Sequence, residues 1–154
     1  MTTAPSVRRP QQHEALMQEL QSEAKFPTYR DILLFAAAIG YRQERRIPFT
    51  NASGDPIKYE TMTVPSFSDT LINMIAANEV SDDPEIMDSN RAEERIKIFE
   101  EYANGGLEYL QEQVNVRHKP ANLVLIDLVT EALSEDGGAM PASVDELLSG
   151  VSWA

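Results

Sequence analysis

The sequence predicts a mainly α-helical fold, a compact domain of about five or six helices with a small β-hairpin at its edge. Apolar residues recur at steps of three and four along most of the chain, and prolines confine the strand-like sequence to one short region. A chain of 154 residues, 42% of them hydrophobic, forms a single core. We therefore expect one helical domain at 13–135, after a flexible arm at 1–12 and before an acidic linker and short C-terminal helix at 136–154.

The first two predicted helices are separated by a proline-containing turn. The first spans residues 13 to about 24, and the second begins after Thr28, a good N-cap residue. Gly40 suits the left-handed position at the end of the second helix. The apolar run at 32–39 includes three consecutive alanines, which favour a helix over a strand. We expect this alanine-rich helix to be buried on nearly all sides and to let a neighbour approach closely.

A short β-hairpin is expected near 46–64, where the sequence becomes rich in β-branched and aromatic residues between turn residues. The prolines in and beside this region keep the hairpin at an edge, because proline cannot donate a hydrogen bond to a central ladder. Beyond the hairpin, Ser66 or Ser68 begins a helix that runs to about Glu79. A short turn of helix follows at Pro84.

A long predicted helix contains two adjacent glycines, Gly105 and Gly106. It starts near Asn90, which forms a capping-box pattern with Glu93, and it runs to about Val114. Two interior glycines cost about 2 kcal/mol relative to alanines, so a neighbour must lie close to the backbone there to offset this loss. The alanine-rich helix is the natural neighbour. The helical phase continues through the glycines along one apolar stripe: Ile96, Phe99, Ala103, Leu107, Leu110 and Val114.

A second stripe lies on another face of the same helix. An ordinary surface helix buries one stripe only. This helix is therefore expected either to be the central helix of the fold or to bury its second stripe in another protein, which would include a second copy of this chain. Polar side chains share the remaining arc, Glu100, Glu101 and Asn104 among them. The candidate protein contacts in the second stripe are Ile98, Tyr102, Gly105 and Tyr109.

The last predicted helix spans 123–133 and leads into an acidic C-terminal region. From Pro120 onward there are six acidic residues and no lysine or arginine. Past two adjacent glycines, apolar residues reappear near the C-terminus. They either close the core of the domain or lay an apolar face into the groove of a partner, so they are also candidate protein contacts. These residues are Leu147, Leu148, Val151 and Trp153.

The charge balance limits nucleic-acid binding to a local patch. Lysine and arginine number 13 against 25 aspartates and glutamates, and the net charge of -12 repels phosphates over most of the surface. The candidate DNA contacts are Arg42, Arg45 and Arg46, which can bind phosphates or pair with neighbours such as Glu44. The sequence has no cysteine, no recognisable export signal and no membrane-spanning apolar run, so we expect a cytoplasmic protein.

No pattern in the sequence indicates a catalytic or cofactor site. The motifs for a phosphate loop, a serine nucleophile elbow and a zinc-binding helix are missing. The carboxylate run from Glu79 to Asp88 lacks the glycine that a calcium loop needs. A nuclease or phosphatase would need carboxylates from separate segments, such as Asp31, Asp69 and Glu101. We therefore expect no catalytic residues, no cofactor and no bound metal.

Several segments of the chain resemble a known family. The most specific are Ala-Ala-Ile-Gly-Tyr at 37–41 and Glu-Glu-Tyr-Ala-Asn-Gly-Gly-Leu at 100–107, supported by 26–31, 45–48 and 71–73. Through these segments, about residues 26 to 112 resemble the small Dnd system-associated proteins called DNA phosphorothioation-associated protein 4. The resemblance implies a bacterial defence context, in which sulfur replaces a non-bridging phosphate oxygen in DNA and companion proteins restrict unmodified DNA. It supplies no catalytic residues and no cofactor.

The resulting hypothesis is a non-enzymatic accessory protein that docks onto other proteins of a phosphorothioation-dependent modification or restriction system. The second stripe of the long helix and the C-terminal apolar residues would make the protein contacts, and the three arginines would make any DNA contact. The alternative is a DNA-binding or antitoxin-like transcriptional regulator of the same system, whose acidic tail masks a basic partner.

Overall fold

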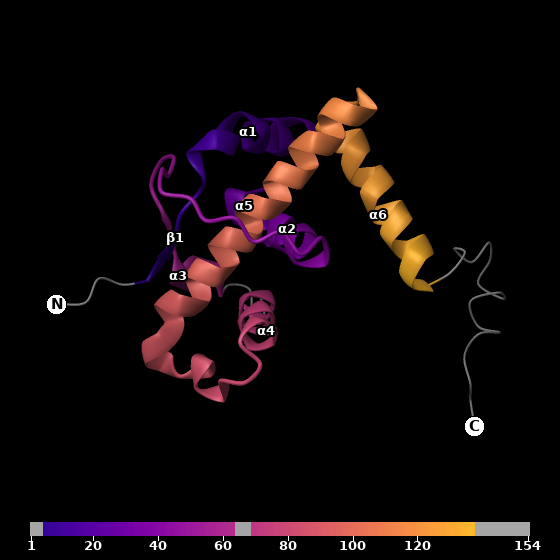
Figure 1. Cartoon of the computed structure of the whole chain (residues 1–154). Coiled ribbons are helices and arrows are strands. Elements are labelled where there is room, and N and C mark those ends of the chain that lie inside the picture. The colour runs from indigo at the N-terminus through magenta and orange to yellow at the C-terminus, as the bar shows by residue number, and fades with distance from the viewer. Residues whose placement is uncertain (1–4, 64–68, 138–154) are drawn as a thin grey trace.

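The fold of the chain is built around one long helix, α5 (Figure 1). A computed structural model describes residues 5–63 and 69–137, and within these ranges it contains six α-helices and one two-stranded sheet, which confirms the mainly α-helical class. The elements follow in this order: β1 (Ser6–Val7), η1 (Gln11–His13), α1 (Glu14–Glu23), α2 (Tyr29–Arg42), β2 (Ile57–Lys58), α3 (Tyr59–Met62), α4 (Thr70–Glu79), η2 (Pro84–Met87), η3 (Ser89–Arg91), α5 (Ala92–Arg117) and α6 (Ala121–Gly137).

The helices α2 and α5 cross at their glycines, which confirms the predicted close approach. A Cβ on Gly106 would lie 1.8 Å from the backbone oxygen of Ala36, and a Cβ on Gly40 would lie 2.0 Å from that of Tyr102. Only residues without a Cβ allow the two backbones to come this close. Gly40 therefore serves packing, and the prediction that it ends the helix is wrong, because α2 continues to Arg42.

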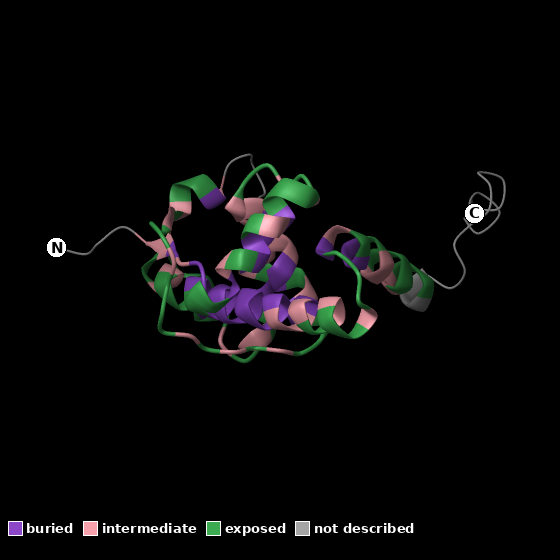
Figure 2. Cartoon of the chain, turned by 90° about the horizontal axis from the view of Figure 1, so that it is seen from above, coloured by how far each residue is buried: buried purple, intermediate pink, exposed green. Residues whose placement is uncertain are grey.

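The middle of α5 is covered around its whole circumference (Figure 2). Every residue from Ile98 to Leu107 is buried, although this segment includes Glu100, Glu101 and Asn104. The helices α2 and α4 and the strand β1 pack against different parts of α5. The first of the two predicted alternatives is therefore confirmed: α5 is the central helix of the fold.

The N-terminal segment packs against α5, so the flexible arm expected at 1–12 is wrong for residues 5–12. The backbone N–H of Arg8 donates a hydrogen bond to Glu100 Oε2 at 2.6 Å, and the Arg8 guanidinium binds the same carboxylate. Val7 is fully buried. The polar sequence of this segment hides these contacts, because its anchor is a carboxylate on a distant helix.

The small sheet is not the local hairpin expected at 46–64. Its antiparallel strands are β1 and β2, with Val7 opposite Ile57, and a bridge between Pro10 and Ala52 continues the same edge. The strand at the end of the predicted region exists, but its partner comes from the N-terminal segment. Turn residues signal only local pairing, so the sequence pattern could not reveal this partner.

The remaining helices agree with prediction except at their ends and except for α3, which forms at Tyr59–Met62 where the second strand of the hairpin was expected. Thr28 caps α2 by accepting a hydrogen bond from the backbone N–H of Asp31, as expected. The capping box predicted at Asn90 does not form, because α5 begins at Ala92 without a side-chain cap. The helix then continues to Arg117, past its predicted end, and stops where His118 adopts a left-handed φ of 54°. The predicted caps Ser66 and Ser68 of α4 lie outside the described residues.

Candidate functional site

An apolar groove lies beside α6, the last described helix. The first turns of α6 are buried through Ala121, Val124 and Leu125, whereas its C-terminal half extends away from the core (Figure 2). Between α6, the C-terminal end of α1 and the middle of α2 is a hollow of about 520 Å³, which we call the α6 groove. Its walls are mostly apolar and are formed by Glu23, Ala24, Phe26, Phe35, Asn122, Leu125, Ile126, Val129 and Thr130.

Four large apolar side chains of α6 are exposed and form a stripe along the helix, and two of them, Ile126 and Val129, line this groove. Their exposed fractions are 45% for Leu123, 61% for Ile126, 43% for Val129 and 52% for Leu133. On a helical wheel these positions share an arc of roughly 120°. We call them the α6 stripe. Contiguous exposed apolar surface is uncommon on monomeric proteins and marks sites of interaction.

A second hollow of about 190 Å³ lies on the α2 side of Val129. Ala38 on α2 is exposed beside it, and Phe35 and Ile39 are only half-buried. The prediction that the alanine-rich helix is buried on nearly all sides is therefore wrong. The cause is the position of α6, which leaves space over this face of α2.

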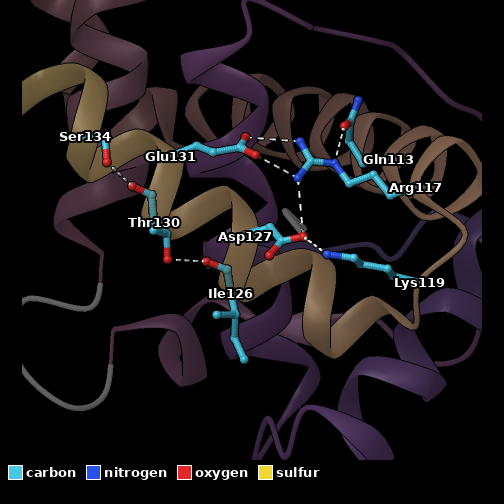
Figure 3. A network of polar contacts seen from close by, with 8 residues as sticks. All are labelled: Gln113, Arg117, Lys119, Ile126, Asp127, Thr130, Glu131 and Ser134. Atoms are coloured by element: carbon cyan, nitrogen blue, oxygen red, sulfur yellow. Dashed lines mark hydrogen bonds and ion pairs between the residues drawn. The ribbon is translucent and has the colours of Figure 1, made fainter. Parts of the chain in front are cut away.

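Surface ion pairs hold α6 to the end of α5 (Figure 3). Arg117 contacts both carboxylate oxygens of Glu131, at 2.8 Å and 3.1 Å, and Lys119 Nζ lies 2.8 Å from Asp127 Oδ2. The hydrogen bond from Lys119 lowers the pKa of Asp127, and that from Arg117 lowers the pKa of Glu131. Exposed pairs of this kind contribute little to stability because water screens them, so they position α6 without fixing it strongly.

Arg46, one of the predicted DNA contacts, belongs to a polar network between α4 and α5. Its Nε lies 2.7 Å from Glu101 Oε1, and its Nη1 lies 2.8 Å from Glu79 Oε1. The Tyr102 hydroxyl donates a hydrogen bond to Glu79, which lowers the pKa of the Glu79 carboxyl group. Burial, together with this hydrogen bond, raises the pKa of Tyr102 to about 12. Arg46 therefore neutralises two carboxylates of the chain itself.

The other two predicted DNA contacts lie at the end of α2 and just beyond it. Arg45 is ion-paired with Glu112 and Glu108, and its guanidinium lies 5.1 Å from the ring centroid of Tyr109. Arg42 lines the smaller hollow beside α6. The structure therefore spreads the three arginines over different contacts, and two of them are engaged by glutamates that the sequence pattern did not assign to them.

Most of the predicted protein contacts on α5 are covered by the chain itself. Ile98 and Tyr102 are buried, and a Cβ on Gly105 would lie 2.0 Å from the backbone oxygen of Arg45. Tyr109 is half-buried and borders the smaller hollow. The first three are thus not available to a partner: the loop after α2 covers Gly105, and Tyr102 packs against Tyr41 of α2 and bonds Glu79 of α4. The predicted contacts Leu147, Leu148, Val151 and Trp153 lie outside the described residues.

The α6 stripe is the part of the surface that sequence reasoning missed. The pattern at 123–133 predicted a helix but gave no reason to expect exposure, because apolar periodicity alone does not show how many faces a helix buries. The available signal was the lack of lysine and arginine from Pro120 onward, next to continuous apolar spacing.

The described residues show no metal site and no membrane span. Within 5–63 and 69–137, no group of three or more histidines or carboxylates is placed to hold a metal ion, so Asp31, Asp69 and Glu101 do not form one. Glu101 is instead bound to Arg46. In the same part of the chain, no helix is long and apolar enough to cross a membrane.

Fold and surface together define a small, acidic, mainly helical protein with an apolar groove beside its last described helix. The family model of DNA sulphur modification system-associated protein 4 matches residues 6–142, and the chain belongs to this family. The match is longer than the segment 26–112 found by resemblance, since it also includes β1 and α6. No curated protein matches the chain, and no solved structure does. The family name associates the protein with a DNA sulphur modification system.

Proposed function

We propose that this chain is a non-enzymatic accessory protein of a bacterial DNA phosphorothioation system used in defence, and that it docks onto another protein of that system through α6. The observation that carries the proposal is the α6 stripe, whose side chains are 43% to 61% exposed beside an apolar groove. Family membership supports the link to the system. The geometry supports docking, because an apolar groove next to an exposed helix face accepts an amphipathic segment of a partner.

Charge favours a protein partner over DNA. The net charge of -12 opposes the approach of phosphates, and the guanidinium of Arg46 is engaged by two glutamates. If Arg46 turned to a phosphate, it would leave the buried carboxylate of Glu101 without its partner, which is strongly unfavourable. The DNA-binding or antitoxin-like regulator is therefore the weaker alternative.

Co-purification with the other proteins of the system tests the docking proposal. We expect the double variant Ile126→Asp, Leu133→Asp to lose the partner, because two charges would enter an apolar interface, and losing contacts of this quality lowers affinity by roughly 30-fold or more. Val116→Asp is the matched control, since Val116 is 71% exposed on α5 and lies outside the stripe. Equal recovery of the partner with the double variant and with the control would overturn docking through α6.

A DNA-binding assay separates the alternative. The regulator hypothesis predicts binding that weakens steeply with salt and is lost when Arg42, Arg45 and Arg46 are replaced by glutamine. Our proposal predicts the same negligible retention of DNA by the wild-type chain and by this triple variant at physiological salt. Specific retention by the wild type alone would favour the regulator.

A further inference from the structure

The exposed face of α6 is complementary in shape to the groove beside it. An apolar protrusion, the α6 stripe, and an apolar hollow, the α6 groove, lie next to each other on the surface. We propose that two copies of the chain pair through α6, with the two α6 helices antiparallel and each facing the groove of the opposite copy. This inference rests on the proposed docking role of the same surface and adds its regulation, because the pair must separate before a partner protein binds.

The α6 stripe and the α6 groove face the same direction. At roughly 100° per residue, Ile126 and Val129, which line the groove, lie about 60° apart on the helical wheel, and Leu133 falls between them. Leu133 lies about one turn beyond Val129 and does not line the groove of its own chain, and it is 52% exposed. A second groove placed opposite the first would therefore cover Leu133.

A twofold axis beside Val129 brings this protrusion and a groove together. In a twofold pair, residue i of one copy meets residue j of the other, and j meets i. With the axis between Val129 and Thr130, Leu133 of one copy lies level with Ile126 of the second copy, which lines the groove there. Each copy thus supplies one protruding side chain and receives one. This is the closed, isologous arrangement found in most homodimers.

The shared face of α6 is uncharged, so pairing buries no ion there. Asp127 and Glu131 lie outside this arc and are ion-paired with the cations at the end of α5 (Figure 3). Among the residues that line the groove, Glu23 alone is charged, and it is exposed. The face therefore fits an identical uncharged helix and does not call for a partner of opposite charge. Within 121–134, the side chains on this arc are Asn122, Leu123, Ile126, Val129, Thr130 and Leu133.

The contact is short, so we expect a reversible dimer. The α6 stripe from Leu123 to Leu133 is about 15 Å long at helical rise, which is small beside the extensive interfaces of obligate homodimers. We expect a Kd on the order of 1 to 100 µM. Each copy carries a net charge of -12, and salt screens the resulting repulsion. The dimer should therefore tighten as the NaCl concentration rises, whereas a contact between unlike charges would weaken.

Analytical ultracentrifugation of the full-length chain, from about 1 to 200 µM, measures the pairing. We expect the wild type to change from monomer to dimer over this range. The variant Ile126→Asp, Leu133→Asp should stay monomeric, a weakening of at least about 30-fold, because two charges from each copy would enter the apolar contact. Val116→Asp, on the exposed surface of α5, should dimerise like the wild type. A wild type that is monomeric throughout, or a dimer that survives in the double variant, overturns the inference.

Single cysteines locate the axis, because the chain has no cysteine of its own. A residue beside the axis meets its own counterpart, so Val129→Cys should form an intermolecular disulfide on oxidation. The two copies of Leu123 would lie about 20 Å apart along the helices, too far for a bridge, so Leu123→Cys should stay uncrosslinked. Equal crosslinking of the two variants, or none with Val129→Cys, would refute the antiparallel pair. Helical circular dichroism of each variant verifies that the fold is kept.

Partner recovery distinguishes failure of this inference from failure of the proposed function. The oxidised Val129→Cys dimer should recover less partner than the same variant after reduction, and equal recovery would refute the regulation. If the wild type stays monomeric but the α6 double variant loses the partner, docking stands and pairing is refuted. If the wild type dimerises through α6 but the double variant keeps the partner, pairing stands and docking through α6 is refuted.

Discussion

The central helix α5 makes two helix contacts of opposite character. Against α2 it presents Gly106 to the backbone of Ala36, where an added Cβ would lie only 1.8 Å from an oxygen. Against α6 it uses surface ion pairs from Arg117, and a groove of about 520 Å³ lies on another side of α6, toward α1 and α2. The comparison teaches that the α2 contact has no room for an added atom, whereas α6 is held by surface contacts and borders open space. Rigidity thus lies at the crossing of α2 and α5, and the open surface lies beside α6.

The strongest test of this contrast is to make the same substitution, Leu→Ala, in both regions. Leu107→Ala in the fully buried middle of α5 should lower the free energy of unfolding by about 2 to 5 kcal/mol, because it removes buried methyl groups and leaves a cavity. Leu133→Ala on α6, where the side chain is 52% exposed, should change it by less than about 1 kcal/mol. Urea denaturation measures both. Similar losses for the two variants would show that α6 is as tightly packed as α5.

Adding one methyl group at the crossing of α2 and α5 tests whether this contact has room for an added atom. In an uncovered helix Gly→Ala stabilises by about 1 kcal/mol. Gly106→Ala should instead destabilise by about 1 to 3 kcal/mol, because the new Cβ meets the backbone oxygen of Ala36 and the helices must separate. The sign of the change in the urea midpoint therefore decides the question. A more stable Gly106→Ala variant would mean that the helices do not touch there.

The smallest expected effect concerns the polar network beside α5 and appears as a pH dependence. Because the pKa of Tyr102 is raised from 10.0 to about 12 in the folded protein, the stability that it contributes is present below about pH 10 and is lost as the pH rises toward about 12. Tyr102→Phe should remove this alkaline loss. The measurement is the difference between wild-type and variant unfolding free energies across that range, which cancels the titration of the other tyrosines and lysines.

The same variant has an effect at acid pH with the opposite sign. The hydrogen bond from Tyr102 lowers the pKa of Glu79, so the stability from this carboxylate is present above its unfolded pKa of about 4.3 and is lost as the pH falls through the folded value. Tyr102→Phe should weaken this loss as well. The network would be contradicted if the difference in unfolding free energy between wild type and variant did not change with pH in either range.

The sequence predicted those features of the fold that depend on the backbone preferences of single residues, such as interior glycines and helix caps. Gly105 and Gly106 conflict with helix propensity, so only a close neighbour explains them, and the alanine-rich helix α2 is that neighbour. The N-cap Thr28 was also predicted, because capping is a local property. Both inferences come from residues whose chemistry is unfavourable or neutral unless one specific arrangement is present.

Features that depend on distant pairs could not be predicted from the sequence. The strand partner of β2 and the carboxylate partners of Arg45 and Arg46 come from remote segments. The sequence around a charged residue does not indicate which distant residue it pairs with. The capping-box pattern at Asn90 was misleading because Asn90 lies within the 3-10 turn η3, which leaves Arg91 at the N-cap position of α5. The candidate site was missed because exposure of the α6 stripe depends on where α6 is placed, which periodicity does not determine.

The unbroken burial of α5 from Ile98 to Leu107 has a consequence for how such a protein can evolve. These ten successive positions are all buried, so most substitutions there are expected to destabilise the fold. Within residues 5–63 and 69–137, the side chains of the α6 stripe remain exposed and carry no such constraint. Under the proposed docking through α6, a few substitutions in α6 would change the binding partner without altering the crossing of α2 and α5.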